Sequence, residues 1–315
     1  MLANRVVVAN PSVDIMSTNT GNCAQIYPMR SSISVMEGLE SVNHLNNILS
    51  TDILSLDKGM RMDALICDSN GRVADIVNCY HMGHSVLIIG IESNADSTRE
   101  LLTKGVRWDQ KLSLLDGNGV LDHLRIIGED PISIVTSLYP ELSELSENTY
   151  LEFENVVFSK GMLNENEMID VIVRRDNSGF YERIERSDYR ISNFEEAEYA
   201  RITVGYPGSN EANTKYLPHD IGLVNLVSLN KGCYPGQEIH ARLDSRGKPK
   251  KRMVVLTTSD ALRNGKHSLS DGTSVSVTSR AVRGDLHLSM GIGSVDVSTD
   301  ATLVDYNGNS RLTLP

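Results

Sequence analysis

The feature of this sequence that most constrains its fold is a series of three short strand candidates joined by tight turns. Residues 63–67 and 72–80 flank the turn DSNG, and residues 85–91 add a third apolar segment. A strand, a tight turn and a returning strand predict an antiparallel hairpin. Helical segments and hairpins are mixed along the rest of the chain, without the regular βαβ order that builds parallel sheets. We therefore expect an α+β protein.

Periodicity predicts several elements around this hairpin. One amphipathic helix is expected to end near residue 50, because apolar residues recur at helical intervals at Val35, Leu39, Val42, Leu45 and Leu49. A second hairpin is expected around residues 116–119, and short helices over 97–105 and 131–139. Strands are expected over 156–158 and 168–174.

A later helix is predicted from its start signal. Ser192, followed by Glu195 three residues on, has the spacing of a capping box. The helix is expected to turn one set of side chains inward, namely Phe194, Ala197, Tyr199, Ala200 and Ile202, and to end before Gly205. Beyond about residue 248, short runs of Val, Leu and Thr alternate with turn residues, which predicts a small β-barrel or sandwich.

Length and charge limit the class of protein. The 315 residues suffice for about two domains. Thirty Lys and Arg against 41 Asp and Glu give a net charge of −11, which argues against general binding to nucleic acids or anionic membranes. The apolar runs are too short to predict a transmembrane helix or a secretory signal. The four cysteines, Cys23, Cys67, Cys79 and Cys233, have no paired spacing, so we expect a reducing, cytoplasmic setting.

The string KGCYPGQE, residues 231–238, is the densest unusual stretch. Its two glycines and its proline fix a tight backbone path. If residues 237–243 form a helix, Cys233 lies near its positive end and beside Lys231, and both features favour a thiolate. The alternative is a turn whose cysteine fills a small apolar gap. A basic run over 246–252 follows, either as a solvated linker or as a site that steers an anion.

Asp75 is the second candidate for chemistry. Strand alternation places it on one face with Val73, Val77 and Cys79, and a carboxylate among aliphatic side chains has a raised pKa unless it is paired. The opposite face is partly apolar as well, so Asp75 could instead lie on a solvated face. His81 and His84 lack regular ligand spacing, and no metal site is predicted.

The KGCYPGQE string resembles the signature of the YgfZ-type family, folate-binding relatives of the glycine-cleavage T protein (aminomethyltransferase, GcvT). An arginine follows the signature in the family, here Arg242. The resemblance extends to Gly71-Arg72 with Asp75, to the stretch from Arg201 through Pro207, and to residues 275–279 with MGIGSV. It covers nearly the whole chain from about residue 30.

This resemblance implies a GcvT-like folate-binding fold of intertwined α+β subdomains around a central hole, closed by a small C-terminal β-barrel. The expected division is residues 1–245 for the folate-binding body and 246–315 for the barrel. The implied cofactor is tetrahydrofolate or a one-carbon derivative. The implied catalytic residues are Cys233, Lys231 and Asp75, and the implied cofactor-binding residues are Asp75, Arg201, Tyr181, Glu182, Lys231, Tyr234 and Gln237.

The function that the resemblance implies is tetrahydrofolate binding in support of iron–sulfur cluster protein assembly or repair, with client or assembly proteins as partners. One alternative is a folate-dependent one-carbon transferase similar to aminomethyltransferase. A T protein has two adjacent acids in the hairpin, whereas this chain has Ala74-Asp75, and the pterin acid after Gly-Phe is displaced to Glu182. A second alternative is an interaction module that has kept the fold and lost the ligand.

Overall fold

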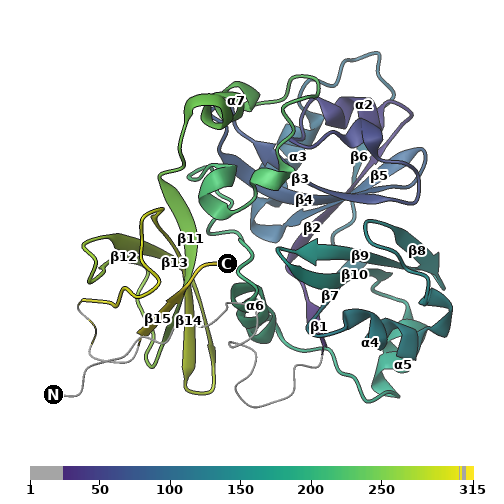
Figure 1. Ribbon diagram of the computed structural model, residues 1–315. Helices are drawn as coiled ribbons and strands as arrows, with labels where there is room; N and C mark the ends of the chain where they lie inside the picture. Colours follow the sequence, from purple (N-terminus) through teal and green to yellow (C-terminus); the bar gives the residue numbers. More distant parts are fainter. Residues whose placement is uncertain (1–23, 305, 307–309) are drawn as a thin grey trace.

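In the part of the chain that the structure describes, the β-structure consists of three antiparallel sheets of five strands each (Figure 1). The computed structural model describes residues 24–304, 306 and 310–315. Cys23 and the start of the N-terminal segment lie outside the described residues. The α+β prediction is confirmed, because helices pack on these sheets without alternating regularly with strands.

The first sheet has the order β3-β4-β5-β2-β6 and contains the three predicted strands. Its bounds are β2 (Ser31–Glu37), β3 (Arg61–Cys67), β4 (Val73–His81), β5 (Ser85–Ile91) and β6 (Ser113–Asp116). Two helices, α2 (Ser41–Asn46) and α3 (Ala95–Thr103), cover one face, and the 3-10 turns η1 (Ile53–Ser55) and η2 (Glu92–Asn94) flank them. Leu45, Val77 and Leu102 belong to the apolar core between sheet and helices.

The second sheet has the order β1-β7-β10-β9-β8. Its bounds are β1 (Gln25–Pro28), β7 (Leu121–Ile127), β8 (Tyr150–Phe153), β9 (Val156–Leu163) and β10 (Asn166–Arg174). The helices α4 (Pro131–Leu138) and α5 (Ser178–Glu185), with η3 (Pro140–Leu142), pack on it around Tyr139, Phe158 and Phe180.

The first two sheets are interleaved along the chain. β1 pairs with β7 in the second sheet, whereas β2, three residues later, pairs with β5 and β6 in the first. The predicted intertwining is therefore confirmed. The hairpin predicted around residues 116–119 is wrong: β6 and β7 do follow each other, but the turn between them carries the chain from one sheet into the other.

Two helix predictions need correction. The helix expected from Val35 is a strand up to Glu37 and a short helix only from Ser41, because Gly38 turns the backbone with a φ of 124° and leaves Leu39 80% exposed. The later helix, α6 (Phe194–Thr203), is capped by Asn193 and Glu196, one residue beyond the predicted pair. This shift leaves Phe194 45% exposed, while Tyr199, Ala200 and Ile202 are buried as predicted.

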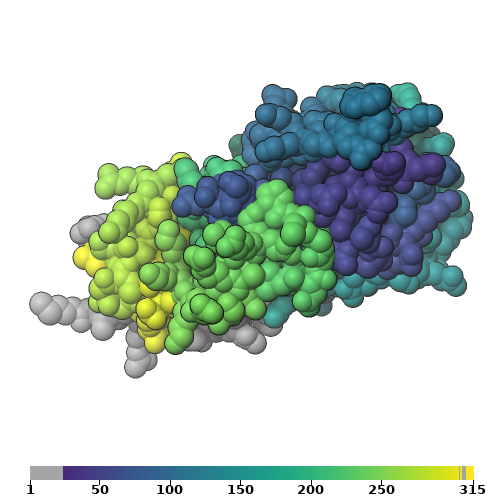
Figure 2. Space-filling model, turned by 90° about the horizontal axis from the view of Figure 1, so that it is seen from above, coloured from purple at the N-terminus to yellow at the C-terminus, as the bar shows by residue number. Residues whose placement is uncertain are grey.

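The third sheet forms the predicted β-rich C-terminal part. Its order is β12-β13-β14-β11-β15, with bounds β11 (Lys251–Thr258), β12 (Gly265–Ser268), β13 (Ser274–Arg283), β14 (Leu286–Ser294) and β15 (Ser310–Thr313). Before it come η4 (Pro218–Ile221), η5 (Val224–Leu226) and α7 (Gln237–Arg246), so the predicted boundary after residue 245 falls at the end of α7. Figure 2 shows the green segment that contains α7 between the purple and blue first sheet and the yellow-green third sheet. Within the described residues, no helix is long and apolar enough to cross a membrane.

Candidate functional site

A cavity of about 600 Å³ lies where the three sheets and α6 meet. This volume is within the range of small-molecule sites. Its lining comes from segments far apart in the chain: Ser31 and Asn78 from the first sheet, His123 and Arg125 from the second, Glu198 and Arg201 from α6, and Arg280 from the third. The packing of α6 against β1 and β13, with α6 between the lobes in Figure 1, brings these segments together.

The buried carboxylate of Asp170 organises the part of the cavity wall formed by the second sheet. Asp170 lies opposite Arg125 in the ladder of β10 and β7, and His123 is two residues from Arg125, so all three share one face of the sheet. Asp170 Oδ1 accepts from Arg125 Nε at 2.7 Å and lies 2.8 Å from His123 Nε2. Burial alone would raise the pKa of Asp170, but Arg125, His123 and Arg61 hold it well below its usual range.

Two further charges lie behind this wall. The guanidinium of Arg61 is fully buried and pairs with Asp63, while its Nη2 lies 3.9 Å from Asp170 Oδ2. Asn78 connects this pair to the cavity, because its amide donates to Asp63 and its Oδ1 accepts from Arg125 Nη2 at 3.3 Å. Arg61 and Arg125 thus balance Asp63 and Asp170, as buried charges require.

Arg201, one of the residues predicted to bind the cofactor, forms the α6 side of the cavity. Glu198 holds its guanidinium with two hydrogen bonds, at 2.8 Å to Nε and 2.5 Å to Nη2. The carbonyl of Tyr206 accepts a third from Nη1 at 2.6 Å. These contacts fix the orientation of the arginine before any ligand binds.

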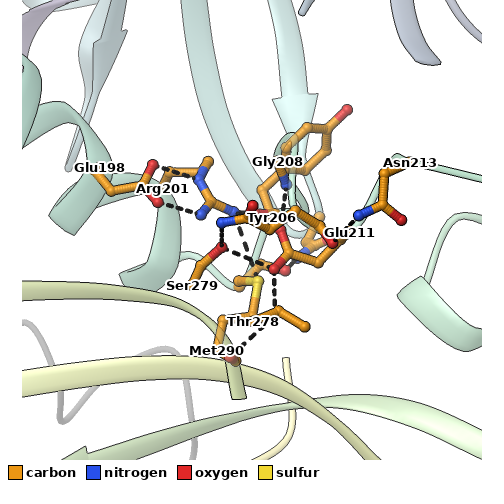
Figure 3. A network of polar contacts seen from close by, with 12 residues as sticks. Glu198, Arg201, Tyr206, Gly208, Glu211, Asn213, Thr278, Ser279 and Met290 are labelled. Atoms are coloured by element: carbon orange, nitrogen blue, oxygen red, sulfur yellow. Dashed lines mark hydrogen bonds and ion pairs between the residues drawn. The ribbon is translucent and has the colours of Figure 1, made fainter. Parts of the chain in front are cut away.

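Glu211 joins this wall to the third sheet (Figure 3). Its fully buried carboxylate accepts from the backbone N–H of Gly208 and from Ser279 Oγ, each at 2.8 Å, and from the hydroxyl of Thr278. Arg201 Nη1 lies 3.5 Å from the same carboxylate. The strand β13, which supplies Thr278 and Ser279, is thereby tied to the loop that follows α6.

Asp75 is buried, so the solvated-face alternative is wrong, but it lies behind the cavity wall and does not line it. Its carboxylate accepts from the backbone N–H groups of Ile76 and Ile91 and from Thr98 Oγ1, the last at 2.6 Å. Burial raises the pKa of Asp75 to about 6, although these hydrogen bonds act in the opposite direction.

The signature loop is anchored on the segment between α2 and η1, away from the cavity lining. Lys231 Nζ donates to the carbonyls of Leu49 and Thr51 at 2.7 and 2.8 Å, and it lies over the ring of Tyr234. Burial lowers the pKa of Lys231 to about 8. Gln237 donates from its amide to the carbonyl of Lys231 at 3.3 Å and closes the loop.

The hairpin turn and the signature loop touch through glycines. A Cβ on Gly236 would lie 2.3 Å from the Cα of Gly71, so only glycine permits this approach. His240, on the predicted helix after the signature, donates from Nε2 to the carbonyl of Gly71 at 2.7 Å and faces the Tyr234 hydroxyl with Nδ1. His240 therefore locks the two turns together and does not pair with Cys233.

Cys233 is exposed on this loop, so the alternative in which it fills an apolar gap is wrong. Cys67 and Cys79 are buried, and burial raises the pKa of each thiol to about 12. Of the three described cysteines, Cys233 is therefore the one available to a reagent or partner.

Tyr181 and Glu182 lie on α5, on the far side of the second sheet from the cavity lining. Gly179 to Glu182 are helical, not extended, so a ligand in the cavity does not meet the acid that follows Gly-Phe. Tyr181 donates its hydroxyl to Asp122, and Glu182 pairs with Arg186.

The basic run 246–252 connects α7 to β11 and contributes nothing to the cavity lining. The described residues contain no group of three or more His, Cys, Asp or Glu side chains placed to hold a metal ion.

The structure thus brings Arg201 to the cavity and gathers Lys231, Cys233, Tyr234 and Gln237 elsewhere. No pattern in the sequence singled out His123, Arg125 or Asp170. One signal was present: Asp170 is an acid between apolar strand residues, the criterion that singled out Asp75.

Comparisons with known proteins add family relationships to this geometry. No family model matches the chain. It is 25% identical over 227 residues to the tRNA-modifying protein YgfZ of Photorhabdus laumondii, across 70% of this chain and 67% of that protein. A chloroplastic protein of Arabidopsis thaliana is 24% identical across 76% of this chain. The matched region covers just over half (57%) of the length of that relative. Aminomethyltransferase T of the glycine cleavage system from Bartonella henselae superposes with a TM-score of 0.74 at 16% identity, over 92% of this chain and 84% of its own. This structural likeness confirms the predicted fold.

Proposed function

We propose that this chain, a YgfZ-type protein with a GcvT-like fold, binds a tetrahydrofolate in its central cavity and supports iron–sulfur proteins through its exposed signature loop. The observation that carries the proposal is the cavity itself. It has the volume of a small-molecule site, and it has carboxylates and arginines placed around apolar side chains.

The cavity chemistry matches the two ends of a folate. A pterin presents a row of N–H donors and needs an acceptor, and Glu195 and Glu198 supply carboxylates on α6. The glutamate tail is anionic, and Arg30 and Arg280 are exposed arginines of the same lining. Ile76, Ile89 and Ile127 provide apolar surface for the rings.

The signature loop supplies the second half of the proposal. Lys231 holds the loop on the carbonyls after α2, and Cys233 faces solvent, where its sulfur is accessible to an iron–sulfur client. The bacterial relatives are named tRNA-modifying proteins. Because its net charge is −11, the present chain should repel RNA. We therefore expect it to serve such a reaction through protein partners and not by binding RNA itself.

Calorimetric titration with tetrahydrofolate under anaerobic conditions tests the binding half. We expect one site per chain and a loss of about 10- to 100-fold in affinity for Glu198→Gln, which removes a charged acceptor. Glu182→Gln is the matched control, since it makes the same change on α5 outside the cavity. Absence of binding at near-saturating folate would favour an interaction module, and equal losses in both variants would contradict the assignment to this cavity.

The cysteine half is tested in cells by the activity of an iron–sulfur enzyme. We expect Cys233→Ala to reduce that activity while folate binding is retained. Cys67→Ala, which changes a buried thiol, is the control for a general loss of stability.

The alternative function, a one-carbon transferase, would release methylene-tetrahydrofolate from a methylamine donor. Asp75 is occupied by hydrogen bonds within the wall, so we expect no such product.

A further inference from the structure

A serine, a histidine and an aspartate form a hydrogen-bonded chain that ends on the cavity. Ser31 Oγ lies 2.7 Å from His123 Nδ1, and His123 Nε2 lies 2.8 Å from Asp170 Oδ1. Ser31 and His123 both line the cavity, whereas Asp170 is fully buried behind them. The three residues come from β2, β7 and β10, so this series of hydrogen bonds spans both interleaved sheets.

The partners of His123 fix the positions of the protons. Asp170 is ionised and only accepts hydrogen bonds, so the Nε2 that faces it carries the imidazole hydrogen. Burial lowers the pKa of His123, which keeps the ring neutral near pH 7. Nδ1 is then unprotonated and accepts the hydroxyl hydrogen of Ser31. A serine oxygen whose proton is drawn toward an imidazole is electron-rich on its cavity side.

The charges around His123 are balanced. Asp170 faces it from β10, Arg125 from the same strand β7, and Arg61 lies beyond Asp170 on β3. Tyr80 on β4 donates its hydroxyl to Asp170 Oδ2 at 3.1 Å. Asp170 and Asp63 together offset the two arginines, so that His123 can take a proton for a short time. Arg125 lines the cavity as well and is a cation available to a negatively charged oxygen there.

We propose that Ser31, His123 and Asp170 form a nucleophilic site in the cavity that transfers acyl groups from small carboxylic esters. Ser31 Oγ forms a bond with the ester carbonyl carbon while its proton moves to His123 Nδ1. The bond from that carbon to the alkoxy oxygen breaks, and the leaving alcohol takes the proton from Nδ1. Water, deprotonated by His123, then releases the acid and restores Ser31. Asp170 is a positioning residue, since it holds the ring and its tautomer.

Labelling with diisopropyl fluorophosphate tests the site without any folate. The probe phosphorylates an activated serine with loss of fluoride, and mass spectrometry of the intact chain and its peptides identifies the residue. We expect one adduct on Ser31 of the wild type, no adduct on Ser31→Ala, and labelling at least about 100-fold slower for His123→Gln, the size of a lost general base. Ser209→Ala is the matched control, because Ser209 also lines the cavity and, among the described residues, no hydrogen bond joins it to a histidine.

Hydrolysis of p-nitrophenyl acetate supplies the turnover measurement. This activity should be lost in Ser31→Ala and in His123→Gln. In the wild type, both rates should fall as pH drops below the depressed pKa of His123 and stay level above neutrality. This profile needs no variant, so a His123→Gln protein that fails to fold does not remove the test. An unlabelled wild type, an adduct on another serine, or equal labelling of folded His123→Gln would overturn the proposal.

Discussion

Removing the Glu211 carboxylate should weaken the attachment of the third sheet to the loop that follows α6. Glu211 accepts three hydrogen bonds from Gly208, Thr278 and Ser279 while fully buried. A hydrogen bond to a charged group contributes about 1.5–3 kcal/mol, so three give an upper limit of about 9 kcal/mol. Such losses are not additive, and water can enter at Thr278. We therefore expect Glu211→Ala to lower the free energy of unfolding by about 3–5 kcal/mol, as for one lost partner of a buried pair.

Guanidinium denaturation followed by tyrosine fluorescence and far-ultraviolet circular dichroism measures this loss. Amide hydrogen exchange shows where the stability is lost. We expect the exchange rate to increase more in β13 than in β4. Glu100→Ala on α3 is the matched control, because that side chain is exposed and its change should cost less than about 0.5 kcal/mol. A loss below about 1 kcal/mol for Glu211→Ala, or exchange unchanged in β13, would refute the assignment of this carboxylate as the junction between the loop after α6 and the third sheet.

Three further changes test other parts of the structure. Since the folded pKa of Asp75 is about 6 against 3.8 for the free group, the folded state keeps a proton that the unfolded chain releases, and wild-type stability should fall by up to about 3 kcal/mol as pH rises from 4 to 6. Asp75→Asn should flatten that slope in denaturation series at each pH. Lys231→Met should cost about 1–3 kcal/mol, because two carbonyls lose their donor, and it should increase proteolysis of the signature loop; an unchanged cleavage rate would contradict this. Asn193→Ala should cost about 1 kcal/mol in thermal denaturation, whereas Ser192→Ala should show no capping loss, because Asn193 is the cap.

Local patterns were sufficient for local elements and failed where pairing is distant in sequence. The strands on either side of the DSNG turn pair as predicted, because turn and partners lie within twenty residues. Nothing in residues 25–37 indicates that β1 and β2 belong to different sheets, since each is defined only by its distant partners. Gly119 is typical of a hairpin turn, because its positive φ suits any sharp change of chain direction. The same φ suits the turn that leads from the first sheet into the second.

The candidate site shows the same division. The signature string could be found from its own spacing, and Arg201 from the resemblance of its surroundings. Ser31, His123 and Asp170 are separated by 92 and 47 residues, so their contact depends on three strands meeting and not on any motif. Tyr181 and Glu182 were assigned from a short string, and the helix α5 places them outside the cavity.

The interleaving of the first two sheets also sets an order of events during synthesis. All five strands of the first sheet lie within residues 31–116, so this sheet can close once that stretch has left the ribosome. β1 emerges earlier but must wait unpaired for β7, which ends at Ile127. The nascent chain therefore carries a free edge strand beside a finished sheet until the second sheet begins to form. Stalling translation after β6 has left the ribosome and before β7 has emerged would prolong that state and expose β1 to pairing with other chains.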